Sequence, residues 1–221
     1  MKRITAAILC LLAVFALAAC GEAEPVQTAE PSPSAEAAPE SSPAETPAEA
    51  PAESTGAGGV LVAYFSATGN TRGVAELIAA ELGADVYEIV PEEPYTEADL
   101  DYSDSSSRTS AEMNDPDARP AISGALPDAA QYDVVFLGYP IWWGQAPRIV
   151  STFLEGCDLT GKTVVPFCTS GSSSIGGSVS DLEALTDGAI WLEGQRFSGS
   201  ASQGTVSQWV DSLGLDLGQA A

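Results

Sequence analysis

Between residues 60 and 215, short apolar runs alternate with amphipathic segments. The runs at 60–65 and 133–138 are rich in β-branched and aromatic residues, which is typical of central parallel strands covered on both faces. At 72–82 the apolar residues instead recur every three or four positions, and this spacing predicts a helix. Strands are expected at 60–65, 84–90, 133–138, 163–168 and 189–192, and helices at 72–82, 105–114, 146–154, 179–185 and 206–215. The alternation predicts an α/β fold with a parallel sheet between two layers of helices.

Residues 91–126 interrupt this alternation. The segment is long for a connection and dense in Asp, Ser and Pro, so we expect a surface excursion that carries at most short helices, the likeliest at 105–114. Two interpretations remain open at this stage. The excursion is either a helical cap that touches a ligand or a structural plug.

The N-terminus has the order of a secretory signal. Two basic residues precede the apolar run 4–19, which is shorter than the ~20 residues that a membrane-spanning helix needs. The run ends in Leu-Ala-Ala-Cys-Gly at 17–21, which resembles the lipobox of bacterial lipoproteins, where cleavage leaves an acylated cysteine. We therefore expect a signal peptide at 1–19, lipidation of Cys20 and a place on the extracytoplasmic face of the cell membrane. The alternative is an ordinary signal peptide with an incidental cysteine.

Composition divides the rest of the chain into a tether and a domain. Residues 20–58 are almost entirely Ala, Pro, Glu, Ser and Thr, cannot bury a core, and are predicted to be a disordered tether. Residues 59–221 form the folded domain and hold 23 acidic and 6 basic residues, a formal charge of −17. This excess excludes nucleic acid as a partner and argues against adhesion to anionic lipid, so the membrane attachment is expected to rest on the acyl anchor.

Cysteine and histidine usage narrows the chemistry further. The chain contains no histidine, which removes the common imidazole zinc sites and any histidine acid or base, and we predict neither a metal site nor a catalytic residue. Cys157 and Cys168 are the cysteines of the domain. They are expected at opposite ends of one strand, beyond the reach of a disulfide, and so not to pair.

Three of the predicted strands end in loops that suit one ligand. In an open α/β sheet, ligands bind beyond the carboxyl ends of the strands. The loop at 66–71 has hydroxyl and amide side chains ahead of a helix, whose N-terminal N–H groups attract anions. Because this loop has no Walker lysine, triphosphate hydrolysis is excluded. The other two loops are 138–147 and 169–177.

These two loops suit a flat ligand. Trp142 and Trp143 are costly to leave exposed, and a heteroaromatic ring would bury one of them; the alternative is that they pack under the following helix as core. In the third loop, Ser170, Gly171 and Ser172 allow the backbone to approach a ligand closely, unless the loop is only a flexible surface segment.

Three motifs in this order resemble the flavodoxin family, and more closely its branch found in bacterial lipoproteins. They are Tyr-Phe-Ser-Ala-Thr-Gly-Asn-Thr at 64–71, Gly-Tyr-Pro-Ile-Trp-Trp-Gly at 138–144 and Pro-Phe-Cys-Thr-Ser-Gly at 166–171. The resemblance implies a doubly wound five-stranded parallel sheet in the order 2-1-3-4-5 that binds FMN without covalent attachment. It implies that the first loop holds the phosphate, the second lines the flavin ring and the third closes the opposite side. The residues implied to bind FMN are Ser66, Thr68, Gly69, Asn70, Thr71, Pro140, Ile141, Trp142, Trp143, Gly144, Thr169, Ser170, Gly171 and Ser172.

Bound FMN would supply redox chemistry, so the expected function is electron transfer outside the cytoplasm. The acidic domain favours a low flavin potential and a redox partner protein with a basic surface. A first alternative is an FMN-dependent quinone or nitro-compound reductase, because residues 139–143 also resemble a loop of flavin quinone reductases. Against it, a protein tethered outside the cytoplasm would not meet free NADPH. A second alternative is a surface-binding lipoprotein that has lost the flavin.

Overall fold

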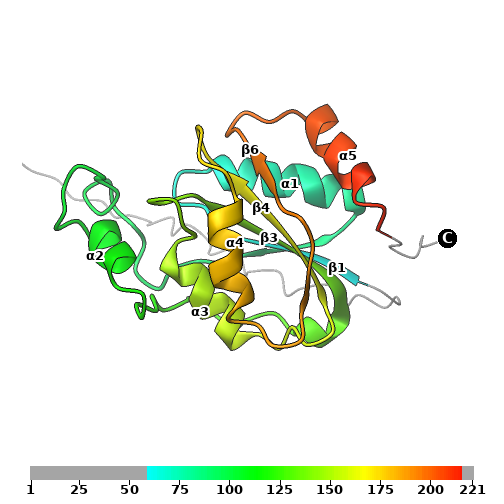
Figure 1. The fold of residues 1–221 in the computed structure, drawn as a ribbon, viewed down its shortest axis with the longest axis horizontal. Coiled ribbons are helices and arrows are strands. Elements are labelled where there is room, and N and C mark those ends of the chain that lie inside the picture. Colours follow the sequence, from blue (N-terminus) through cyan, green and yellow to red (C-terminus); the bar gives the residue numbers. More distant parts are fainter. Residues whose placement is uncertain (1–58, 216–221) are drawn as a thin grey trace, which may run out of the picture. The chain divides into compact units, whose positions relative to one another are not determined.

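The structure is a computed structural model that describes residues 59–215 (Figure 1). The predicted signal peptide at 1–19, the lipidation of Cys20 and the tether at 20–58 lie outside the described residues. Among the residues that are described, no helix is both long and apolar enough to cross a membrane.

A parallel sheet forms the centre of the domain. Its order is β2-β1-β3-β4, with β5 and then β6 following one another along the outer edge of β4, and every neighbouring pair of strands is parallel. The strands are β1 (Gly59–Tyr64), β2 (Asp85–Glu88), β3 (Tyr132–Pro140), β4 (Thr163–Thr169), β5 (Ile190–Trp191) and β6 (Gln195–Phe197). Because β5 and β6 share the fifth position, the doubly wound sheet with the order 2-1-3-4-5 is confirmed.

The last strand is interrupted, and the prediction of one strand at 189–192 was wrong in its extent. The Leu192 N–H donates to the Val164 carbonyl at 3.0 Å, but the next N–H on that side of β4 would come from Pro166, which has none. Gly194 packs directly on Pro166, so that a Cβ there would overlap the proline. Pairing resumes in β6, with one extra residue on the edge strand, which is a bulge.

Four helices cover the sheet, and α2 lies in the excursion at 91–126, away from the sheet (Figure 1); all five fall at the places predicted from the sequence, with shifted ends. They are α1 (Asn70–Leu82), α2 (Arg108–Asn114), α3 (Arg148–Gly156), α4 (Gly176–Glu183) and α5 (Gln203–Ser212). Capping sets two of the starts. Ser107 accepts a hydrogen bond from the Ser110 N–H at the start of α2, and Ser202 accepts one from the Thr205 N–H at the start of α5.

The two faces of the sheet belong to separate apolar clusters. Alternate residues of each strand point to opposite faces, with α1 and α5 on one side and α3 and α4 on the other (Figure 1). The α1 and α5 side includes Val62, Phe136, Phe167, Val74, Ile78 and Val206. The α3 and α4 side includes Leu61, Val135, Leu137, Ile149, Phe153 and Leu182. Both layers therefore fix the sheet, and with it the loops at the carboxyl ends of its strands.

β2 (Asp85–Glu88) is shorter than the strand predicted at 84–90, and its place at the edge of the sheet leaves two of the predicted apolar residues exposed. Ile89 is buried, as its apolar side chain suggested, but Val86 and Val90 are 50% and 41% exposed. An edge strand is covered less completely than a central one, and β2 pairs only with β1.

Gly138 in the centre of β3 makes room for the Phe167 ring of the neighbouring strand, and a Cβ at Gly138 would overlap that ring. We therefore expect Gly138→Ala to lower the free energy of unfolding by about 1–3 kcal/mol, the usual cost of overpacking a core. Gly73→Ala is the matched control. No atom lies within 4 Å of a Cβ at this helical position, so the control should be neutral or stabilising by up to about 1 kcal/mol. Urea denaturation measures both, and equal stabilities would contradict the packing argument.

Candidate functional site

The first loop, at 66–71, joins β1 to α1 and includes the first two residues of that helix, Asn70 and Thr71. Gly69 has φ +84°, a left-handed conformation that favours glycine, and no side chain caps α1. The N–H groups of the first turn of α1 therefore have no side-chain partner, and the positive end of the helix dipole adds to them. This end of the sheet offers an anion hydrogen-bond donors without any lysine.

Hydroxyl groups surround this helix start. The Ser66 Oγ is fully enclosed and has no hydrogen-bond partner. The Asn70 Nδ2 donates to the Thr68 Oγ1 at 3.1 Å. The Thr71 and Thr169 hydroxyls are buried and 2.8 Å apart, so one hydrogen bond ties the first loop to the third. The Arg72 guanidinium pairs with Glu88 instead of the loop.

The second loop contains a tight turn with a strained residue. Trp142 and Gln145 exchange two backbone hydrogen bonds of 2.9 Å, and the two residues between them, Trp143 and Gly144, have φ values of 47° and 81°. This is the geometry of a type I′ turn, which requires positive φ at both central positions. Within 59–215, Trp143 is the single residue other than glycine with positive φ. Strained backbone of this kind is concentrated at functional sites.

The two tryptophans have different environments. Trp142 is 2% exposed and packs edge-to-face on Phe65 and Tyr95, with ring centroids 5.5 and 5.4 Å away. Trp143 is 49% exposed, and its ring lies 4.8 Å from that of Tyr102. The interpretation as core thus holds for Trp142, although this residue also lines a cleft.

The third loop is bonded to the strand beside it. The Ser170 N–H donates to the Phe197 carbonyl at 3.1 Å, and the Arg196 Nη1 donates to the Ser170 carbonyl at 3.0 Å. The Ser170 hydroxyl donates to the Ser173 carbonyl. These contacts argue against the alternative of an unattached surface segment, because β6 holds the start of the loop.

The three loops meet around one cleft of about 400 Å³. Eight of the predicted site residues line it, namely Thr68, Asn70, Pro140, Ile141, Trp142, Thr169, Ser170 and Gly171. The other six, which are Ser66, Gly69, Thr71, Trp143, Gly144 and Ser172, belong to the same loops but are not part of its lining. The sequence analysis missed Ala67, Leu100, Tyr102, Ser198 and Gly199. Ser198 and Gly199 follow β6, so a prediction of that strand would have found them.

The lining of the cleft is electrically neutral. It contains no Asp, Glu, Lys or Arg, and its one titratable group is Tyr102, whose pKa is raised by burial. Within the described residues, no group of three or more His, Cys, Asp or Glu side chains is placed to hold a metal ion. Such a lining can bind and orient a ligand through hydrogen bonds and ring contacts, but it supplies no carboxylate or amine for acid–base chemistry near pH 7.

The two cysteines of the domain are both unpaired, as expected. Burial raises the pKa of the Cys157 thiol to about 11 and that of the Cys168 thiol to about 12. Because the thiolate is the reactive form, both groups are expected to react far more slowly than free cysteine at neutral pH. Thiol chemistry is not available to this site.

With this geometry in view, comparison with known proteins identifies the family. The family model described as Flavodoxin matches residues 59–213, and the chain belongs to this family. No curated protein matches the chain.

Solved structures agree with this assignment. A candidate flavoprotein from Bacteroides uniformis is 48% identical, with a TM-score of 0.68 over 70% of this chain and 98% of its own. One from Bacteroides eggerthii is 49% identical, with a TM-score of 0.67 over 72% and 99% of the two chains. A flavoprotein from Lactobacillus acidophilus, solved in complex with FMN, is 22% identical, with a TM-score of 0.53 over 70% and 99%. The chain is thus a flavodoxin-like flavoprotein by family and fold.

The raised thiol pKa values lead to a direct chemical prediction. In the native chain at pH 8, neither Cys157 nor Cys168 should be alkylated by iodoacetamide within the time in which free cysteine reacts completely. Peptide mass spectrometry can follow each residue separately. After unfolding in urea, both should react. Rapid native labelling of Cys168 would contradict its burial in β4.

Proposed function

We propose that the cleft binds FMN without covalent attachment and that the protein carries electrons. The family assignment supports a flavin, and the Lactobacillus acidophilus relative was solved with FMN. The observation that carries the proposal is the Ser66 hydroxyl, which is buried without a partner; Ser66 does not itself line the cleft but belongs to the loop whose Thr68 and Asn70 do, ahead of the uncapped start of α1. A buried polar group without a partner costs about 1–3 kcal/mol, and a phosphate oxygen would accept its hydrogen bond.

The phosphate end of the site consists of neutral donors. Thr68 and Asn70 line the cleft, and Gly69 and Thr71 shape the helix start next to them. Gly199 packs against the Asn70 side chain, where a Cβ would overlap Asn70. Donors held in this way lose little freedom when an anion binds.

The ring end of the site consists of the second and third loops. Pro140, Ile141 and Trp142 line one part of the cleft, and Thr169, Ser170 and Gly171 line another. In the proposed complex the flavin ring lies between these segments, and FMN supplies the redox chemistry when it is bound. Trp143 and Gly144 shape the turn beside the ring, and Ser172 extends the third loop. The protein's own part is to bind, to orient the ring and to exclude water.

The size of the cleft favours a carrier over a reductase. Ligand pockets range over about 300–1,000 Å³, and the 400 Å³ found here lies near the lower end. A cofactor would fill this space and leave little room for a second organic substrate. The reductase would be preferred if the purified protein turned over a quinone steadily with a diffusible electron donor. A colourless protein without flavin affinity would instead favour a binding lipoprotein that has lost the flavin.

The proposal also covers the redox partner of the protein and its location in the cell. The charge of −17 over 59–221 suits a redox partner with a basic surface, whose association weakens as salt rises. Lipidation of Cys20 after the lipobox-like sequence would anchor the domain on the extracytoplasmic face of the cell membrane. The acidic tether would then hold the domain away from the lipid headgroups. Mass spectrometry of the N-terminal peptide tests the acylation.

Ser66→Ala is the sharpest test of FMN binding. It removes a hydroxyl that has no hydrogen-bond partner within the protein, so stability should be unchanged or raised while FMN affinity falls. Loss of a hydrogen bond to a charged group, worth about 1.5–3 kcal/mol, predicts a dissociation constant roughly 10- to 150-fold higher. Quenching of flavin fluorescence in titrations of the purified full chain measures it.

Thr152→Val in α3 is the matched control for this titration. The Thr152 hydroxyl is also buried without a partner, but Thr152 belongs to α3 and lies outside the three loops that meet at the cleft. The control should bind FMN as the wild type does. The proposal fails if the wild type does not bind FMN, or if the Ser66 and Thr152 variants bind it equally well.

The acidic surface should also lower the reduction potential of the bound flavin. Added negative charge disfavours the extra electrons on the cofactor, so the potential is expected below that of free FMN. Exposed carboxylates are screened by salt, so raising the ionic strength should move the potential upward. Spectroelectrochemical titrations at low and high salt measure both effects. A potential at or above that of free FMN at low salt would contradict this expectation.

A further inference from the structure

The excursion at 91–126 contributes to the cleft. Leu100 and Tyr102 line it together with the three loops. The third loop, at 169–177, contains no aromatic residue. We propose that Tyr102 is a binding residue for the ring of a planar heteroaromatic ligand, and this proposal rests on the proposed FMN function. The residues of the excursion that line the cleft, Leu100 and Tyr102, precede α2, so the helix itself is not the part that reaches the ligand.

The base of the excursion is closed by backbone hydrogen bonds. Pro91 at its start and Ile122 near its end form an isolated antiparallel bridge, in which the Glu92 N–H donates to the Ala121 carbonyl at 2.9 Å and the Ser123 N–H donates to the Val90 carbonyl at 2.8 Å. The segment therefore starts and ends at one fixed point. Its tip is then positioned by contacts within the excursion.

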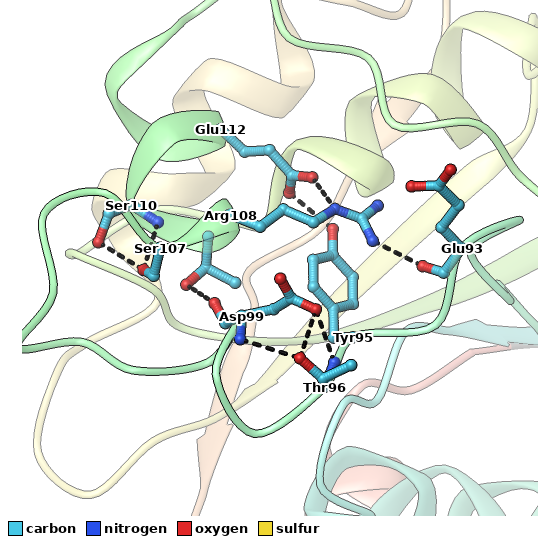
Figure 2. Close-up of polar contacts among 9 residues, drawn as sticks. Glu93, Tyr95, Thr96, Asp99, Ser107, Arg108, Ser110 and Glu112 are labelled. Atoms are coloured by element: carbon cyan, nitrogen blue, oxygen red, sulfur yellow. Dashed lines mark hydrogen bonds and ion pairs between the residues drawn. The ribbon is translucent and has the colours of Figure 1, made fainter.

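A compact cluster docks α2 onto the core (Figure 2). The Tyr95 ring packs on Trp142, and its hydroxyl donates to Glu112 at 2.6 Å. The Arg108 Nε donates to the same carboxylate at 2.7 Å, and the guanidinium lies 4.2 Å from the centre of the Tyr95 ring. Arg108 also donates to the Glu93 carbonyl at 2.7 Å. The pKa of Tyr95 is raised, by burial first and by the bond to Glu112 second, so its hydroxyl remains a donor at all ordinary pH values.

α2 in turn holds the segment that carries Tyr102. The Thr109 hydroxyl donates to the Asp99 carbonyl at 2.6 Å, and the Ser110 hydroxyl donates to the Asp104 carbonyl at 2.7 Å. Both hydroxyls belong to buried residues. The segment 99–104 is thus fixed on both sides of Tyr102. Figure 2 shows Asp99, with its hydrogen bonds from Thr96, near Arg108 and Glu112.

Tyr102 meets the second loop at the mouth of the cleft. Its ring centroid is 4.8 Å from that of Trp143, and the two residues are 55% and 49% exposed. Half-exposed aromatic rings gain by covering a flat apolar ligand, and aromatic pairs contribute about 0.5–1.5 kcal/mol beyond the area they bury. The ring of Tyr102 is therefore placed to contact the ring of a flat ligand in the cleft.

Two flavins separate this role from the phosphate site. FMN and riboflavin share the ring, but riboflavin has no phosphate. Tyr102→Ala in the full chain should weaken both by the same factor, roughly two- to tenfold, and move the visible spectrum of the bound flavin toward that of free flavin. Tyr102→Phe keeps the ring and should bind both as the wild type does. Ser66→Ala should weaken FMN alone.

A second pair of variants tests the position of Tyr102. Thr109→Val removes the hydroxyl that holds Asp99 and should weaken both flavins in the same direction as Tyr102→Ala, whereas Thr109→Ser keeps the hydroxyl and should not. The inference is overturned if Tyr102→Ala binds FMN and riboflavin with unchanged affinity and spectrum. It is supported if Tyr102→Ala weakens the binding of FMN and of riboflavin by the same factor. A wild-type chain that binds neither flavin would refute the proposed function itself.

Discussion

The burial of Trp142 is the interaction on which the cleft depends. Its ring packs on Phe65 at the end of β1 and on Tyr95 of the excursion, while one part of it lines the cleft. Three segments far apart in the sequence are therefore fixed by one side chain. Edge-to-face contacts of this kind restrict where each ring can lie, so the loop that follows Trp142 starts from a defined position. The strained turn at Trp143 is held by this anchor on one side and by α3 on the other.

The residues that line the cleft and the charged residues of the domain are different sets. The cleft is lined by hydroxyls, backbone groups and rings, and none of its lining residues is charged. The acidic residues lie outside this lining, where they act on a ligand only through space and through salt-dependent screening. The affinity for FMN and the reduction potential of the bound flavin therefore depend on different residues. A mutation such as Ser66→Ala should change the first with little effect on the second, and surface charge reversals should do the opposite.

The parallel sheet could be predicted from the alternation of strands and helices, and the three converging loops from the rule that parallel strands place their carboxyl ends at one edge of the sheet. The order of the strands came from the resemblance to the flavodoxin family. The break in the last strand could not be located, since it depends on which neighbour Pro166 faces. Tyr102 was missed for a different reason. Its segment has no periodic pattern, and its position depends on buried hydroxyls of α2 that read as ordinary surface residues in the sequence. Trp142 and Trp143 could not be told apart before the turn between β3 and α3 was known.

The most direct test of the account is a crystal structure of the protein with FMN. The account predicts a phosphate oxygen within hydrogen-bond distance of the Ser66 Oγ and of N–H groups in the first turn of α1, with the flavin ring in the cleft between the second and third loops. A ring bound outside this cleft, or a phosphate that leaves the Ser66 hydroxyl without a partner, would contradict it.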